Sequence, residues 1–90
     1  MAARRRRVER NAQYRTPAYR DLARRLSVNL RSVREQQGLT QEEAAFRCDM
    51  STRLLQQVEA GDTNATLTTI ARLAAGLGVD PSRLFRGGRQ

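Results

Sequence analysis

The sequence predicts an all-α fold of five helices, with an extended first helix and a basic N-terminal arm. Apolar residues recur at steps of three and four, as they do along one face of a helix. Hydroxyl or Asp–Pro helix starts and glycine stops bound these runs. No segment shows the strict alternation of a half-buried strand. Of the 90 residues, we assign 1–16 to the arm, 17–86 to one domain and 87–90 to a loose tail.

The first helix begins at Thr16–Pro17, where a hydroxyl cap is followed by proline at the first helical position. It ends near Gly38, a residue suited to the left-handed stop of a helix. An apolar stripe runs between these two points, and we expect it to face the core. The stripe consists of Tyr19, Leu22, Leu26, Leu30 and Val33.

Two short helices follow, over about 40–48 and about 51–60. Thr40 and Glu43 have the spacing of a capping box at the start of the helix over 40–48. Its inward face is narrow because its side chains are small: Ala44, Ala45 and Cys48. Ser51 caps the helix over 51–60, whose apolar side holds Leu55 and Val58. Its polar side holds Thr52, Arg53, Gln56 and Gln57.

Two more helices complete the domain. Thr66 caps the fourth, which Gly78 closes, and Asp80–Pro81 starts a short fifth. Four apolar residues of the fourth helix are expected to face inward: Leu67, Ile70, Leu73 and Leu77. The fifth carries Leu84 and Phe85.

The positive charge is concentrated at the N-terminus. Residues 1–25 hold nine arginines and two acids, or +7, whereas residues 26–90 hold eight arginines and seven acids, or +1. A basic arm on a nearly neutral domain favours polyanions, first nucleic acid and then an anionic membrane surface. A solvated tail that only aids solubility is the alternative interpretation.

The composition excludes several kinds of site. A chain without histidine has no His/Cys zinc site and no His-based triad. Cys48 alone cannot form an internal disulfide, and we expect a small buried apolar group rather than a reactive thiol. No apolar run approaches the roughly 20 residues of a membrane span, and no secretory h-region follows the basic N-terminus. We therefore expect a cytoplasmic, nucleoid-associated protein without metal or cofactor.

Residues 40–60 have the pattern of a DNA-binding helix-turn-helix: a helix, a three-residue break and a second helix. Further motifs surround it, namely Arg34, Gly38-Leu39-Thr40-Gln41-Glu42, Ala45, Ser51, Val58-Glu59-Ala60-Gly61 and Leu73-Ala74-Ala75-Gly76-Leu77-Gly78-Val79. With these motifs, residues 26–85 resemble the phage-repressor/Cro-like family, also called the xenobiotic-response-element family.

The resemblance implies a five-helix lambda-repressor-like domain whose third helix enters the major groove of double-stranded DNA. Arginine can form a bidentate pair with guanine, and glutamine with adenine. We expect Arg53 and Gln57 to be the main base readers, with Thr52 and Gln56 next. Relatives commonly bind as two-fold dimers with half-sites about 34 Å apart. We expect a homodimer joined through Leu84 and Phe85 or through the extended first helix.

The resemblance also implies phosphate contacts at helix N-termini, whose free N–H groups attract anions. The candidates are Thr40, Gln41, Ser51, Asn64 and Thr66, together with Arg4, Arg5, Arg6 and Arg7 of the arm. Arg34 and Glu59 match a pair that forms an internal salt bridge in relatives. Its role is structural, because it would tie the first helix to the third.

Five features depart from the family pattern, two of which are a first helix that begins about eight residues early behind the basic arm, and Leu54, which flanks the polar side of the helix over 51–60. Asp49 holds the turn position that is usually glycine, and we expect it to adopt a left-handed conformation. The loop after Gly61, often basic in relatives, contains Asp62 and no arginine before Arg72. Phe46 stands on the outer side of its helix, where relatives usually have a polar residue.

Phe46 has three interpretations: packing under Tyr14 or Tyr19, contact with a protein partner, or a single exposed aromatic ring. The rival to a DNA-binding transcriptional regulator is a protein-interaction adaptor or antitoxin-like partner on the same fold, which Phe46, Leu54 and Asp62 favour. RNA binding through the arm alone is a third hypothesis. An enzyme is the class least expected, because Glu42 and Glu43 suit a helix cap and dipole better than acid–base catalysis.

The arm yields the first testable prediction. A nearly neutral domain attracts DNA weakly, so the arm should supply much of the counterion release. Neutralising about six phosphates would give a log–log salt slope near −5. Deletion of residues 1–15 should flatten this slope markedly in DNA titrations across a salt series. An unchanged slope would sink the hypothesis.

Overall fold

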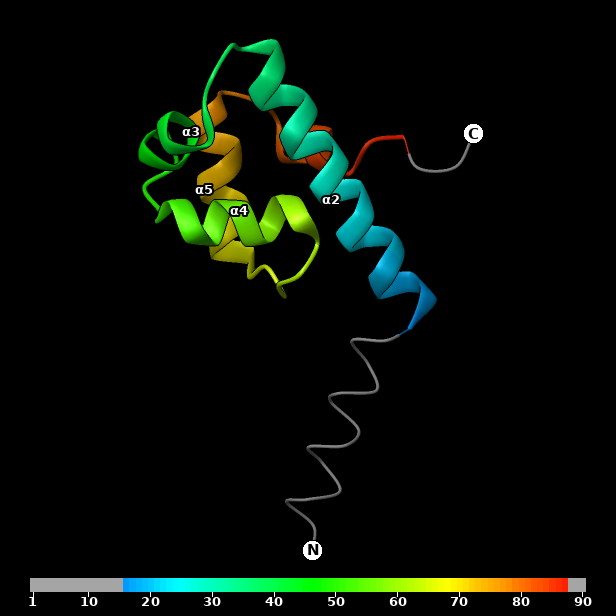
Figure 1. The fold of residues 1–90 in the computed structure, drawn as a ribbon. Helices are drawn as coiled ribbons and strands as arrows, with labels where there is room; N and C mark the ends of the chain where they lie inside the picture. The colour runs from blue at the N-terminus through cyan, green and yellow to red at the C-terminus, as the bar shows by residue number, and fades with distance from the viewer. Residues whose placement is uncertain (1–15, 88–90) are drawn as a thin grey trace, which may run out of the picture.

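The structure is a computed structural model that describes residues 16–87. Its elements are α2 (Pro17–Gln36), α3 (Gln41–Arg47), α4 (Thr52–Ala60), α5 (Leu67–Leu77) and the 3-10 helix η1 (Pro81–Phe85) (Figure 1). No strand occurs within residues 16–87, in agreement with the predicted all-α class. The short fifth helix expected after Asp80 forms as the five-residue 3-10 helix η1, a geometry typical of short connectors, so residues 16–87 hold four α-helices and one 3-10 helix. The predicted arm up to residue 15 and the tail from 88 lie outside the described residues.

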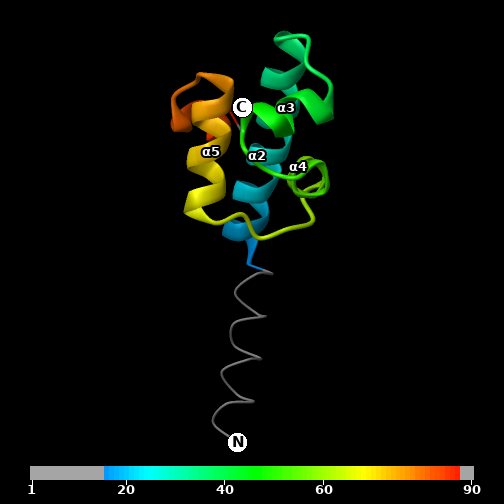
Figure 2. The same ribbon diagram turned by 90° about the vertical axis from the view of Figure 1, so that its left-hand side faces the viewer.

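α2 is the longest element and forms the spine of the domain. It starts as predicted: the Thr16 hydroxyl accepts a hydrogen bond from the Tyr19 N–H at 3.1 Å, and Pro17 stands at the first helical position. It contacts α4, α5 and η1, and in Figure 2 α5 lies on one side of it and α4 on the other. In the described part of the chain, no helix combines the length and apolar content needed to span a bilayer.

The next three helices are each capped by a hydroxyl. The side chains of Thr40, Ser51 and Thr66 accept hydrogen bonds from the third residue of their helices. The predicted capping box is complete, since Thr40 N–H donates to the Glu43 carboxylate at 2.8 Å. This backbone hydrogen bond, with the second one from the Thr40 side chain, lowers the pKa of Glu43. The caps fix where each helix begins and therefore where its N-terminal N–H groups point.

The core is built from one fully buried leucine on each of four elements. Leu30 of α2, Leu55 of α4, Leu73 of α5 and Leu84 of η1 are all 0% exposed. The predicted small inward face of α3 is buried as well. Cys48 packs at its end as the small buried group that the sequence predicted, and burial raises the pKa of its thiol.

Two residues of the predicted apolar stripes do not face the core. Leu67 is 84% exposed because it starts α5, where no described element covers the first turn. Leu22 is 50% exposed because it lines an open groove rather than the closed core. The periodicity places both on the correct helical face, but that face extends beyond the elements that pack against it.

α3 and α5 approach each other closely at Gly76. A Cβ at this position would lie 2.6 Å from the Arg47 carbonyl oxygen and 2.7 Å from Cys48 Sγ. Atoms cannot pack at these distances, so only glycine permits this contact between the end of α3 and α5.

Gly76→Ala should therefore lower the free energy of unfolding. Overpacking costs about 1–3 kcal/mol, and the better helix propensity of alanine offsets at most about 1 kcal/mol of it. Urea denaturation followed by circular dichroism measures the difference. The control is Thr68→Ala on the exposed side of the same helix, with an expected change within about 0.5 kcal/mol. Equal stabilities for the two variants would contradict the close approach.

Candidate nucleic-acid interface

α3 and α4 are joined by a tight turn at Asp49. Asp49 has φ 55°, which is the left-handed conformation that the sequence predicted for this turn position. Two backbone hydrogen bonds close the turn, from Asp49 N–H to Phe46 O at 3.2 Å and from Met50 N–H to Ala45 O at 3.0 Å. Aspartate tolerates this conformation better than most residues, so the turn forms without glycine.

α4 separates its side chains into a buried and an exposed face. Leu55 and Val58 are buried, as predicted. Arg53 and Gln56 are exposed, and Thr52 and Gln57 are partly exposed. All four candidate base readers therefore project from one side of a helix whose other side is packed into the core. Below, these four residues are called the reading face.

Glu59 sits in the last turn of α4 and is also buried, at 2% exposed. Its carboxylate accepts a bidentate pair from Arg34 of α2, through Nε and, at 3.1 Å, through Nη2. The hydrogen bond to Glu59 is the largest cause of the raised pKa of Arg34. Arg34 also donates to the Leu39 carbonyl at 2.9 Å. The pair expected from the resemblance is thus present, and it joins α2 to α4.

Gln41 connects this buried carboxylate to the reading face. Its Nε2 donates to Glu59 Oε1 at 3.0 Å, and its Oε1 accepts from Gln56 Nε2 at 3.2 Å. The sequence placed Gln41 among phosphate candidates and Gln56 among base readers, with no link between them. The structure brings them together, so the Gln56 amide is oriented by α3 as well as by its own helix.

Sequence reasoning missed two α2 residues that reach the same end of α4. The Ser27 hydroxyl donates to the Glu59 carbonyl, and Arg31 Nε lies 3.8 Å from Glu59 Oε1. Their spacing with Arg34 was an available signal, since steps of three and four place all three on one face of α2.

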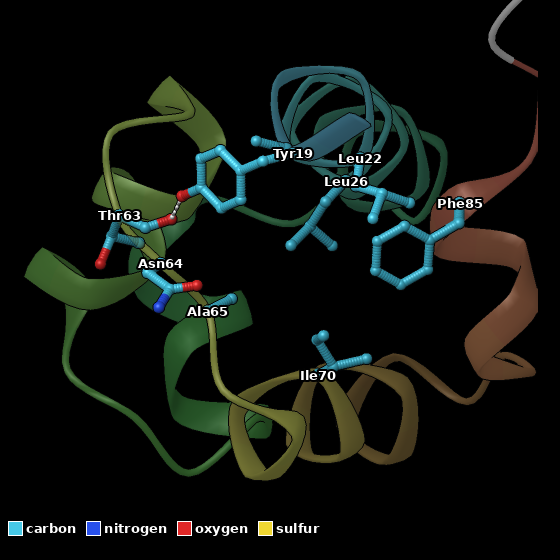
Figure 3. A pocket seen from close by; sticks show the side chains of 9 residues that line it. Tyr19, Leu22, Leu26, Thr63, Asn64, Ala65, Ile70 and Phe85 are labelled. Atoms are coloured by element: carbon cyan, nitrogen blue, oxygen red, sulfur yellow. Dashed lines mark hydrogen bonds between the residues drawn. The ribbon is translucent and has the colours of Figure 1, made fainter. Parts of the chain in front are cut away.

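The remaining phosphate candidates lie at helix starts and in one loop. Thr40, Ser51 and Thr66 are exposed caps of α3, α4 and α5, and Asn64 is exposed in the loop between α4 and α5. Figure 3 shows how this loop is held: the Tyr19 hydroxyl donates to the Thr63 carbonyl at 3.4 Å. Arg4, Arg5, Arg6 and Arg7 lie outside the described residues.

The position of Phe46 corrects one expectation. Its ring is 87% exposed on α3, so it does not pack under Tyr19, which faces the loop after α4. Tyr14, the other expected neighbour, lies outside the described residues. No group of His, Cys, Asp or Glu side chains within residues 16–87 could hold a metal ion.

A helix-turn-helix family model, HTH_3, matches residues 30–84. The chain belongs to the HTH_3 family. The resemblance to phage-repressor/Cro-like proteins is thereby confirmed. An HTH-type transcriptional regulator of Sinorhizobium fredii, described as uncharacterized, is 37% identical over 59 residues, which are 66% of this chain and 77% of the relative.

Two solved structures of helix-turn-helix regulators have folds similar to that of this chain. The restriction-modification controller protein C.AhdI from Aeromonas hydrophila has a TM-score of 0.68 and 33% identity, over 70% of this chain and 96% of the controller. An HTH_3 family transcriptional regulator from Vibrio cholerae has a TM-score of 0.69 and 26% identity over 71% of this chain. This chain spans only 36% of the Vibrio protein.

The Arg34–Glu59 pair of this HTH_3 domain yields a stability prediction. Arg34→Met would leave a carboxylate with 1% side-chain exposure without its bidentate partner. We expect a loss of about 3–5 kcal/mol in unfolding free energy. Arg34→Met with Glu59→Met should recover most of it, because an apolar pair strands no charge.

The matched control is Arg31→Ala. Arg31 has 57% side-chain exposure and lies 3.8 Å from the same carboxylate, so its removal should cost less than about 1 kcal/mol. Thermal and urea unfolding of all three variants give the comparison. If Arg34→Met proved no more destabilising than Arg31→Ala, the pair would not hold α4 in place.

Proposed function

We propose that this protein is a sequence-specific transcriptional regulator that binds double-stranded DNA and reads the major groove with α4. The observation that carries the proposal is the reading face: four polar side chains on a helix whose opposite side is packed into the core. Membership of the HTH_3 family supports a DNA-binding regulator. The names of the similar proteins, a transcriptional regulator and a restriction-modification controller, support the same class.

The dimensions of α4 suit the groove. Nine residues at 1.5 Å each make a helix of about 13 Å, close to the roughly 12 Å width of the major groove. Arg53 would bond guanine, and Gln57 would bond adenine. Gln56 keeps its second amide hydrogen and its oxygen for a base, with its other N–H directed at Gln41. Thr52 would contact a base or the sugar–phosphate edge.

Phosphates would be held at both sides of this helix. Ser51 caps α4 and Gln41 is the first residue of α3, so the free N–H groups at these helix N-termini would face one strand in the proposed complex. Thr40, Asn64 and Thr66 add exposed polar groups. The Arg4–Arg7 cluster of the arm would contribute counterion release.

The protein would bind a two-fold site as a homodimer. The predicted contact through Leu84 is wrong, because Leu84 is 0% exposed and packs in the core. Phe85, which is partly buried, and the extended α2 remain the candidates, since Leu22 is 50% exposed and Val28 is 55% exposed on α2. A dimer of this kind requires half-sites about 34 Å apart.

Selection of bound duplexes from a random pool at fixed salt tests the proposal. Wild-type protein should return one preferred, two-fold symmetric sequence. Arg53→Ala with Gln57→Ala should reduce the preference for that sequence by about 1–3 kcal/mol per lost bidentate pair. The control removes the same residue types elsewhere, with Arg86→Ala and Gln36→Ala at exposed positions. If the wild type bound all duplexes with equal affinity, sequence-specific reading would be ruled out. If the Arg53→Ala/Gln57→Ala variant kept its affinity, nucleic-acid binding by the arm alone, including RNA binding, would be favoured.

A protein partner at Phe46 is the second candidate, because a ring that is 87% exposed stands on α3 beside Glu42 and Glu43. It corresponds to an adaptor or antitoxin-like role on the same fold. Phe46→Glu should then change assembly or partner binding in sedimentation while leaving the fold intact. Wild-type behaviour in sedimentation and in DNA titration would remove this candidate.

A further inference from the structure

Two arginines that the proposed function leaves unused lie beside the C-terminal end of α4. Arg20 and Arg24, both exposed on α2, line a groove of about 290 Å³ together with Ala60 and Gly61. Ser27 also lines the groove, and its hydroxyl donates to the Glu59 carbonyl, which links this part of α2 to α4. The groove is therefore formed where α2 and α4 are in direct contact.

The charged side chains that line this groove are both positive. Arg20 and Arg24 have no ion-pair partner within residues 16–87, whereas neighbouring Arg25 pairs with Asp21 at 2.9 Å. No acid lines the groove. The two side chains stand four residues apart on a helix, about 5–6 Å at Cβ, so they can hold one phosphate or two successive ones.

The groove adjoins the reading face. Ala60 follows Arg53 by seven residues and Gln56 by four, which places it on the same exposed side of α4, one or two turns further on. A helix of about 13 Å lying across the major groove brings its two ends to opposite strands. The N-terminal end has helix N-termini to hold phosphate, but the C-terminal end is followed by Asp62 and carries the negative pole of the helix.

We propose that Arg20 and Arg24 bind the phosphodiester backbone of the DNA strand that faces the C-terminal end of α4. They supply the cations that the loop after Gly61 lacks. This inference rests on the proposed function, because it takes α4 to lie in the major groove. It adds a binding site on the extended first helix, and that site carries no base specificity.

The salt dependence of binding to a mixed-sequence 24-base-pair duplex tests the proposal. Arg20→Gln with Arg24→Gln should reduce the log–log slope by about 2, one unit per phosphate contact, and weaken binding at least about tenfold at 0.1 M salt. Arg20→Lys with Arg24→Lys keeps both charges and should retain the slope. Arg86→Gln, at the exposed residue that follows η1 and lies outside the groove lining, is the control for the loss of one exposed arginine. Unfolding curves establish that each variant is folded.

Neutral methylphosphonate linkages locate the contact on the selected duplex. Wild-type binding should weaken at one or two adjacent linkages on a single strand in each half-site, and the double glutamine variant should be insensitive to the same linkages. The proposal would be overturned if the double glutamine variant lowered the salt slope no more than Arg86→Gln does. It would also be overturned if the same methylphosphonate linkages weakened the wild type and the double variant equally. Sequence preference is measured separately, at fixed salt. A protein without sequence preference would contradict the proposed function, whereas an unchanged salt slope in the double variant would contradict only this phosphate site.

Discussion

The carboxylate of Glu59 is buried in the last turn of α4, and the geometry of the candidate interface depends on how it is neutralised. Arg34 from α2 supplies a bidentate guanidinium, and Gln41 from the start of α3 supplies an amide. One carboxylate thereby fixes three helices relative to one another. A buried charge tolerates little displacement, because any movement away from its donors leaves it unsolvated. The orientation of α4 is therefore set by a directional contact as well as by apolar packing.

Close packing of small side chains gives the same region its second constraint. Gly76 lets α5 approach the end of α3, and α3, which also contacts α4, buries only the small side chains of Ala44 and Ala45. The left-handed Asp49 then turns the chain sharply enough for Ser51 to open α4 beside α3. These contacts place the polar side of α4 opposite a closely packed support of small side chains and backbone.

The two ends of α4 differ in their electrostatic environment. At its start, uncharged caps and helix N-termini offer N–H groups, a suitable environment for phosphate without any arginine. At its end, the helix pole and Asp62 are unfavourable for an anion, and the only cations lining the adjacent groove come from α2. The extension of the first helix toward the N-terminus thus has a physical role in the proposed complex. It brings positive charge to a place where the local sequence has none.

The sequence by itself determined the features that depend on neighbours within about four residues. Helix starts at Thr16, Thr40, Ser51 and Thr66 and the left-handed turn at Asp49 follow from local hydrogen bonds and backbone sterics. The polar side of α4 follows from helical periodicity alone, and the Arg34–Glu59 pair was available through resemblance to relatives. The base-reading roles stay predictions.

Only the tertiary structure decided which helical faces are covered and which distant side chains meet. Leu67 lies on an apolar stripe but is exposed, because coverage depends on where the neighbouring helices end. The contacts of Gln41 with Gln56 and of Ser27 with Glu59 span 15 and 32 residues, so helix crossing angles control them. The groove beside Ala60 is likewise formed by two helices far apart in sequence. Local patterns carry no information on such angles, because the angles result from the simultaneous packing of all the side chains in the core.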